Sequence, residues 1–409
     1  MHYSLTRATA WNLTGYLYLI VASLISVPII VNSLGVELFG QYSLIVATLA
    51  MASSLNLGLP QSVVRALSRD HADQSSLQTI WATSSHLFAL TGIIGATVAT
   101  VISYYLHVHF QLLPVVFGLS LINGVVTHYL TLPHAEGHFG YFNAKTFIVG
   151  TANTLLAAYL AYIGQGILEI FIAQLVCYLI SLIFLVHFSL KYFPRPWEYR
   201  SSRATAKSLV SFGLKSQVGT IVGQVQAQYG KYLLAAVSPL LLSAYVVATG
   251  LVQKAAGGVV QLATALYPSS ARGTLSPHFA QTYYRLQLGL GITGIFGVVF
   301  YRLYGLTLLS WWLDNPELVT PVNAVLSILV MYLAILVLTP LASAVLDGRG
   351  RPELTSLLAS VTTAVEIVVA LLLYPRYGYL APAYAALIAI GLTTPVLLII
   401  TSRMLQSKS

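Results

Sequence analysis

Five polar side chains follow one face of an otherwise apolar stretch, residues 208–237. As a helix this stretch is long enough to cross a bilayer, which takes about 20 residues. Its polar residues lie three or four positions apart and form one stripe: they are Gln217, Thr220, Gln224, Gln228 and Lys231. The stripe predicts a helix that lines a hydrated path through a membrane. The alternative is a buried helix whose glutamines bond to neighbouring helices.

Two further charged residues, Lys254 and Glu366, fall near the centres of other apolar stretches. Ionisable residues inside a membrane are costly and usually functional. Lys254 is therefore predicted to bind an anionic substrate. Glu366 is a candidate for ion or proton coupling, because burial favours the neutral form of a carboxyl group. The alternative is a structural lock, in which the two residues pair with each other or with neighbouring polar groups.

Lysines lie at both ends of the polar stripe. Lys215 extends it towards the predicted inner end, and Lys231 closes it at the outer end. Both are candidate cavity residues. Such long side chains can also reach the membrane interface while their stems stay in the apolar region, which makes Lys231 the weaker candidate.

The composition identifies the class of protein. Of the 409 residues, 57% are hydrophobic and only 8% are charged, whereas about a quarter of a soluble domain is charged. We therefore expect an all-α polytopic membrane protein. The single cysteine, Cys177, excludes an intramolecular disulfide and a cysteine-based metal site. We predict no catalytic residue, no metal and no cofactor, and there is no Walker motif for ATP hydrolysis.

Twelve apolar stretches have membrane-spanning length, and an even number places both termini on one side. They are residues 10–32, 39–59, 80–106, 112–131, 143–163, 167–190, 208–236, 239–266, 284–304, 320–346, 354–374 and 381–402. Most of the 20 Lys and Arg residues fall on the side of the termini, so the positive-inside rule predicts that both termini are cytoplasmic. The same asymmetry explains the net charge of +9 without a nucleic-acid partner.

The longest predicted inner loop divides the spans into two sets of six. It covers residues 191–207 and contains KYFPRPWEYRSSR. We predict an amino-terminal lobe of residues 1–190, a basic cytoplasmic linker at 191–207 and a carboxy-terminal lobe of residues 208–409. The halves are faintly similar in sequence, as expected for parallel repeats, and substrate sites in such transporters lie between the repeats near the midplane.

Several short segments resemble a known family. They are LGVELFGQYSLI (34–45), NLGLPQSVVRALS (56–68) and AEGHFGYFNAKTFIVGTANTLLA (135–157). These segments are similar to Wzx-type polysaccharide flippases of the MOP (multidrug/oligosaccharidyl-lipid/polysaccharide) exporter superfamily, which also holds the MATE multidrug transporters. The match is carried by Leu34, Gly35, Phe39, Gly40, Tyr42, Gly58 and Arg65. We interpret these positions as structural, shaping the outer hairpin and the inner end of the second span.

The resemblance implies two six-helix lobes around a central cavity in the bacterial cytoplasmic (inner) membrane. It also implies that an undecaprenyl-diphosphate-linked oligosaccharide is flipped by alternating access for O-antigen, capsule or exopolysaccharide biosynthesis. In this family cationic cavity residues meet the diphosphate, and the matching candidates are Lys215, Lys231 and Lys254. The implied partners are this lipid-linked oligosaccharide, membrane lipids, a polysaccharide polymerase and a chain-length regulator.

Two alternatives belong to other functional classes. A MATE-like, cation-coupled multidrug exporter commonly places acidic groups in its cavity, and here Glu366 stands against several lysines. A membrane glycan polymerase or ligase would change the glycan covalently. Such an enzyme usually needs a sizeable outer catalytic loop, and the predicted outer loops are short.

Overall fold

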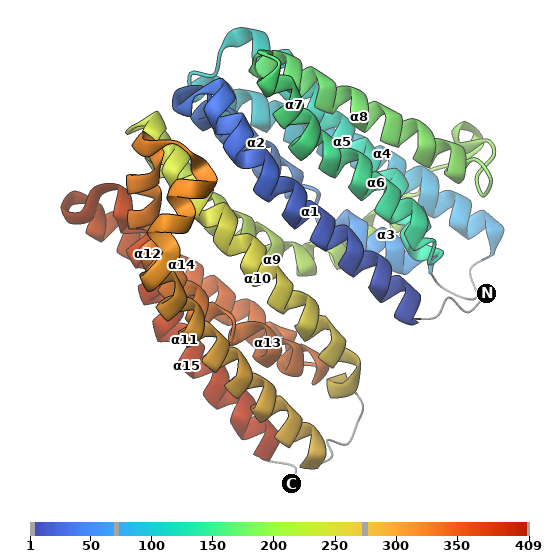
Figure 1. The fold of residues 1–409 in the computed structure, drawn as a ribbon. Coiled ribbons are helices and arrows are strands. Elements are labelled where there is room, and N and C mark those ends of the chain that lie inside the picture. Colours follow the sequence, from blue (N-terminus) through green and yellow to red (C-terminus); the bar gives the residue numbers. More distant parts are fainter. Residues whose placement is uncertain (1–4, 69–72, 272–276, 407–409) are drawn as a thin grey trace. The chain divides into compact units, whose positions relative to one another are not determined.

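A computed structural model describes residues 5–68, 73–271 and 277–406, and every regular element in these ranges is helical (Figure 1). The all-α fold class predicted from composition is therefore confirmed for this part of the chain. The chain divides into two compact units, residues 1–224 and 225–409. This boundary falls inside the seventh predicted span. The lobes and linker that we predicted from charge and repeats remain a prediction, because compactness alone does not test them.

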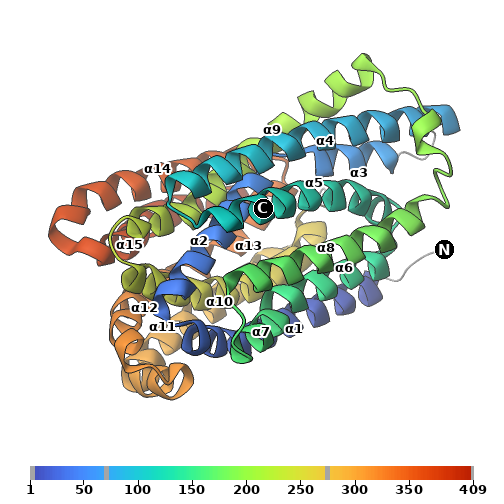
Figure 2. The same cartoon turned by 90° about the horizontal axis from the view of Figure 1, so that it is seen from above.

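The first unit packs its helices against both neighbouring and distant parts of the sequence. α1 packs on α6 and α7, and α4 packs on α5, which also contacts α8 (Figures 1 and 2). The bounds are α1 (Leu5–Leu34), α2 (Val36–Ser53), α3 (Leu59–Leu67), α4 (Gln74–Tyr105), η1 (Phe110–Leu112), α5 (Leu113–Ala135), α6 (Phe139–Thr151), η2 (Ala152–Leu156), α7 (Ala157–Tyr162), α8 (Ile167–Ser189) and η3 (Pro196–Glu198). The π-helical segment η2 joins α6 to α7 in one continuous helical run. That run contains the predicted span 143–163.

The second unit begins within α9 (Arg203–Ala235). α10 packs on α12 and α13, α11 packs on α12, and α14 packs closely on α15. The bounds are α10 (Pro239–Ala271), α11 (Pro277–Leu313), α12 (Pro316–Leu336), α13 (Thr339–Gly348), α14 (Pro352–Tyr377), η4 (Gly378–Leu380) and α15 (Ala381–Gln406). Proline stands in the first turn of α12, α13 and α14, where its missing N–H has no helical partner to lose.

In the described ranges, 9 helical segments are long and apolar enough to cross a membrane. The three remaining predicted spans are also helical. α9 carries the polar stripe, the run α6–η2–α7 is divided by its π-helical segment, and α14 and α15 together form one apolar segment of 54 residues, Pro352–Leu405. The protein is thus a multi-pass helical membrane protein with about 12 helical passages.

The second predicted span, 39–59, ends earlier than the sequence indicated. α2 stops at Ser53, and Leu57 and Gly58 then adopt positive φ values of 55° and 64°. A right-handed helix cannot continue through such residues. A Cβ atom on Gly58 would lie well inside 3.0 Å of the Gly213 carbonyl oxygen, and one on Gly213 would meet the Leu57 carbonyl oxygen as closely. The chain therefore requires glycine on both sides of this contact between the turn and α9.

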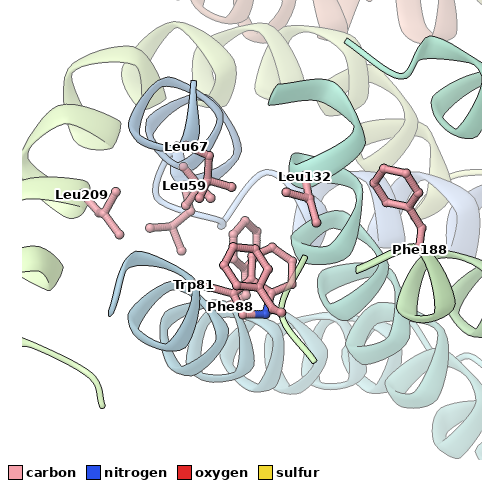
Figure 3. Packing of buried hydrophobic residues seen from close by; sticks show 9 residues of the cluster. Leu59, Leu67, Trp81, Phe88, Leu132, Phe188 and Leu209 are labelled. Carbon is pink, nitrogen blue, oxygen red and sulfur yellow. The ribbon is translucent and has the colours of Figure 1, made fainter. Parts of the chain in front are cut away.

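The short helix α3 is held by a buried apolar cluster (Figure 3). Leu59, Val63 and Leu67 lie four residues apart, so they share one face of α3. This face packs against Trp81 and Phe88 of α4, as Figure 3 shows for Leu59 and Leu67. The cluster also contains Leu132, Phe188, Phe193 and Leu209. α4, α5, α8 and the start of α9 thereby fix the position of α3.

Candidate functional site

The acidic residue of the predicted site is Glu366, on α14 of the second unit. Only 3% of this residue is exposed. Gln226 of α9 donates a hydrogen bond from Nε2 to the Glu366 Oε2 atom at 2.7 Å. The Tyr229 hydroxyl, one turn further along α9, interacts with the carboxyl group and donates to the Pro382 carbonyl oxygen at 3.5 Å. A buried carboxyl group needs such partners, because leaving it unpaired in an apolar environment is costly.

Two more tyrosines complete the surroundings of Glu366. Tyr245 of α10 and Tyr332 of α12 both interact electrostatically with its carboxyl group. The Glu366 carboxyl group is therefore surrounded by amide and hydroxyl side chains that can donate or accept hydrogen bonds. This arrangement suits a carboxyl group that changes its protonation state without losing its neighbours.

A polar cavity of about 170 Å³ adjoins this group. Gln226 lines the cavity and also donates to Glu366, so one amide connects the two. Hydroxyl groups dominate its polar lining: Tyr332, Thr339, Ser343, Thr355, Thr362, Thr393 and Thr394. Thr362 donates to Thr393 at 2.9 Å, and the buried Thr394 hydroxyl has no partner among the described residues. The cavity volume is several times the roughly 30 Å³ that one water molecule occupies in the liquid.

The two candidate lysines of the second unit lie close to each other. Lys231 of α9 and Lys254 of α10 are half-buried and interact as like charges. The Lys254 Nζ atom donates to the Gly250 carbonyl oxygen at 3.3 Å. Two ammonium groups in proximity form a positive centre in the membrane-spanning part of the unit, and such a centre favours an anionic ligand.

The lock alternative, in which Lys254 and Glu366 pair with each other or with neighbouring polar groups, stays a prediction. Two exposed ion pairs, Arg195–Glu198 and Arg351–Glu353, lie within the part of the chain that the structure describes. Glu366 is satisfied by neutral side chains.

The predicted glutamines are not all equivalent. Gln217 belongs to the first unit, is 2% exposed and donates from Nε2 to the Ser54 carbonyl oxygen. Gln224 is the last residue of that unit. Gln228 belongs to the second unit and is buried. The Lys215 side chain lies outside the described residues, so its role stays a prediction. Glu366, Gln228, Lys231 and Lys254 all belong to the second unit.

Sequence reasoning missed the α9 residues that bind Glu366. Gln226 lies two positions from both Gln224 and Gln228, hence about 200° around the helix from each. Tyr229 lies on the same side as Gln226, since three residues nearly complete a turn. The polar stripe thus marked one face of α9, while the partners of Glu366 stand on the opposite face. Their spacing of three residues is the signal that could have found them.

Comparison with known proteins supports a family and a fold. The polysaccharide biosynthesis protein family matches residues 5–274, which is more than half of the chain. A putative O-antigen transporter of Shigella flexneri is 22% identical over 256 residues, or 56% of this chain and 57% of that protein. The chain therefore spans little more than half the length of the curated relative that it matches.

Two solved structures share the fold over nearly their whole length. One is the inward-facing conformation of a multidrug resistance MATE family transporter of the MOP superfamily, with a TM-score of 0.67, 13% identity, and coverage of 98% of this chain and 96% of that one. The other is a MOP superfamily transporter from Pyrococcus furiosus, described as having a binding pocket of reverse polarity, with a TM-score of 0.61, 14% identity, and coverage of 98% and 95%.

These findings confirm the resemblance noted in the sequence. The fold is that of MOP-superfamily transporters, and it favours a transporter over the alternative of a glycan polymerase or ligase. The chain belongs to the polysaccharide biosynthesis protein family and has the fold of the MOP exporters.

Proposed function

We propose that this protein flips an undecaprenyl-diphosphate-linked oligosaccharide from the inner to the outer leaflet of the bacterial cytoplasmic membrane, by alternating access. The product would feed O-antigen, capsule or exopolysaccharide synthesis. A charged, sugar-bearing head group cannot cross about 30 Å of hydrocarbon unaided. The family match and the O-antigen transporter relative support this class of cargo.

The observation that carries the proposal is the lysine pair of the second unit. Lys231 and Lys254 both belong to the second unit and repel each other. A diphosphate would relieve that repulsion by binding between two positive charges. In the proposal these lysines, with Lys215, contact the diphosphate, while Gln217, Gln224 and Gln228 line the path of the sugars.

Glu366 is the proposed coupling group. Protonation would convert its carboxyl group from an acceptor of the Gln226 hydrogen bond into a group that can also donate one. The hydroxyl-lined cavity at Gln226 would give water access to it. An inward proton gradient could then be linked to the change between the two access states.

A second candidate is a MATE-like exporter of cationic drugs. It is favoured by the buried acidic group Glu366 and by the MATE transporter among the structures that share the fold. The reverse pocket polarity described for the Pyrococcus furiosus transporter indicates that this fold accommodates pockets of different charge. For this chain the paired lysines favour an anionic cargo over a cationic one.

The proposal places both termini in the cytoplasm and the lipid-linked oligosaccharide as the main partner. Membrane lipids surround the protein, and a polysaccharide polymerase and a chain-length regulator would use its product on the outer side. No nucleic acid is involved in this scheme.

Surface-glycan display in a deletion strain tests the function. The strain would carry wild type, Lys254→Ala or Lys254→Arg, and the amount of each protein in the membrane would be followed in parallel. We expect Lys254→Ala to abolish most display at normal protein level and Lys254→Arg to restore part of it. Intact display in the deletion strain, with no second flippase present, would overturn the function. Drug susceptibility of the same strains would then test the exporter alternative.

A further inference from the structure

Two cavities of the first unit share one arginine. The first, of about 320 Å³, has a lining rich in hydroxyl groups: Ser62, Ser76, Thr205 and Ser208, together with Arg65 and Phe212. The second, of about 350 Å³, has mainly apolar walls that include Pro60, Val64, Leu130 and Phe142, and Arg65 again lines it. Both volumes reach the lower end of the range for small-molecule sites, about 300–1,000 Å³.

The geometry of α3 explains why Arg65 stands between them. The core face of α3 is formed by Leu59, Val63 and Leu67. At about 100° per residue, Arg65 lies about 200° from Val63 and therefore points away from the core. Pro60 and Val64 flank Arg65 on one side of the helix and Ser62 on the other, and these two flanks line the apolar and the hydroxyl-lined cavity respectively.

The guanidinium group of Arg65 is held in place but not neutralised. Its Cζ atom lies 4.2 Å from the centre of the Phe212 ring of α9, a cation–π contact. Neither of the two ion pairs found among the described residues includes Arg65. The stacked guanidinium group thus keeps its positive charge and its N–H donors available at the boundary of the two cavities.

We propose that these two cavities are a docking site for the diphosphate of the lipid-linked substrate, with Arg65 binding the diphosphate. The lipid chain next to the diphosphate occupies the apolar cavity, and the first sugar occupies the hydroxyl-lined cavity. This inference rests on the proposed function and adds a site on the first unit, whereas the lysine pair belongs to the second. It also revises our interpretation of Arg65 as a purely structural position.

The order of environments along the site matches the order of groups in the ligand. An apolar cavity, a fork of charge-assisted donors and a hydroxyl-lined cavity follow one another, as do a hydrocarbon chain, a diphosphate and a sugar. A free diphosphate would use Arg65 but leave the apolar cavity unoccupied. Arginine suits the central position because its planar fork binds phosphate oxygens in a bidentate way.

Binding of a polyprenyl diphosphate without sugar to the purified full chain tests this site, with inorganic diphosphate as the second probe. We expect Arg65→Ala to weaken binding of the lipid probe about tenfold or more, and Arg65→Lys to weaken it less, since the charge is kept and the fork is lost. Arg200→Ala removes an exposed arginine of the same unit that lines neither cavity, and it should bind as wild type does.

Gln61→Trp separates a lipid site from a site for free anions. Gln61 is exposed and lines the apolar cavity, so a tryptophan there fills the cavity without entering the core. We expect this variant to weaken binding of the lipid probe and to leave binding of inorganic diphosphate unchanged. Equal effects on both probes, or none on the lipid probe, would overturn the placement of the lipid chain.

The outcome for Arg65 is separable from the outcome for the proposed function. Wild-type affinity in a folded Arg65→Ala variant would overturn the docking site, even where the wild-type chain restores glycan display. Conversely, Arg65-dependent lipid binding in a protein whose deletion leaves display intact would support the site and overturn the flipping function. Thermal unfolding of each variant in detergent establishes that it is folded.

Discussion

The two units of the protein place charge in opposite ways. In the first unit Arg65 is exposed, stands on a nine-residue helix and is positioned by a rigid apolar cluster behind that helix. In the second unit Glu366 is buried within a long helix and is positioned by polar side chains that bond to it directly. A surface charge thus depends on the shape of its scaffold, whereas a buried charge depends on its partners.

This difference predicts different sensitivities. The scaffold of Arg65 should fail when backbone packing is disturbed, even by one methyl group at a distance. The Glu366 site should tolerate small changes of shape but respond to any loss of a donor or of its titratable proton. Substitutions in each unit can separate the two cases.

The largest effect is expected at the contact between α9 and the turn before α3. Gly213→Ala adds a methyl group that collides with the Leu57 carbonyl oxygen. Backbone cannot yield cheaply, so we expect a loss of about 2 kcal/mol of stability and a clearly lower midpoint of thermal unfolding in detergent. Gly223→Ala is the matched control on the same helix, since nothing lies within 4 Å of its added methyl group. Equal midpoints for both variants would contradict the close contact.

The second prediction concerns the titratable proton of Glu366. Glu366→Gln keeps the size and the bonding capacity of the side chain, so the midpoint of thermal unfolding should stay near that of wild type. If the carboxyl group couples transport to a gradient, glycan display should fall about tenfold, in line with usual coupling free energies. Glu366→Ala should also lower stability by about 1–3 kcal/mol, because Gln226 loses its partner. Full display with Glu366→Gln would exclude the coupling role.

Much of the fold could be predicted from the sequence, and there is a physical reason why the rest could not. The number of helical passages follows from the length and apolarity of each stretch, which are local properties. The break after α2 depends on Leu57 in a left-handed conformation, which leucine rarely adopts. Gly58 of this turn lies against Gly213, more than 150 residues away in the sequence, and local sequence patterns do not indicate such a contact.

The site was predicted only in part, because it too combines local features with contacts between distant parts of the sequence. Lys254 and Glu366 stand out because a single charge interrupts an apolar stretch, and the structure places both in the second unit. The partners of Glu366 lie on α9, 140 residues away, and glutamines occur on both faces of that helix. Sequence spacing identifies faces of a helix, but it does not tell which face meets which neighbour.

The third prediction measures one bond of the buried network. Tyr229→Phe keeps the ring and removes the hydroxyl group, which interacts with Glu366 and donates to the Pro382 carbonyl oxygen. Because Gln226 still donates at 2.7 Å, we expect a loss of only about 1 kcal/mol, seen as a small shift of the unfolding midpoint. A double-mutant cycle with Glu366→Gln should show coupling between the two positions. Strictly additive effects would mean that the hydroxyl group and the carboxyl group act independently.

The smallest effect is expected where both units place charge in the same way. Arg195–Glu198 and Arg351–Glu353 are exposed ion pairs, one in each unit, with N–O distances of 3.4 and 4.0 Å. Exposed pairs contribute about 0–1 kcal/mol, because water screens the charges and both side chains lose freedom. Glu198→Gln and Glu353→Gln should therefore leave the unfolding midpoint and glycan display close to wild type. A large loss from either substitution would show that exposure alone does not distinguish the charges that matter, and the contrast between Arg65 and Glu366 would then need another cause.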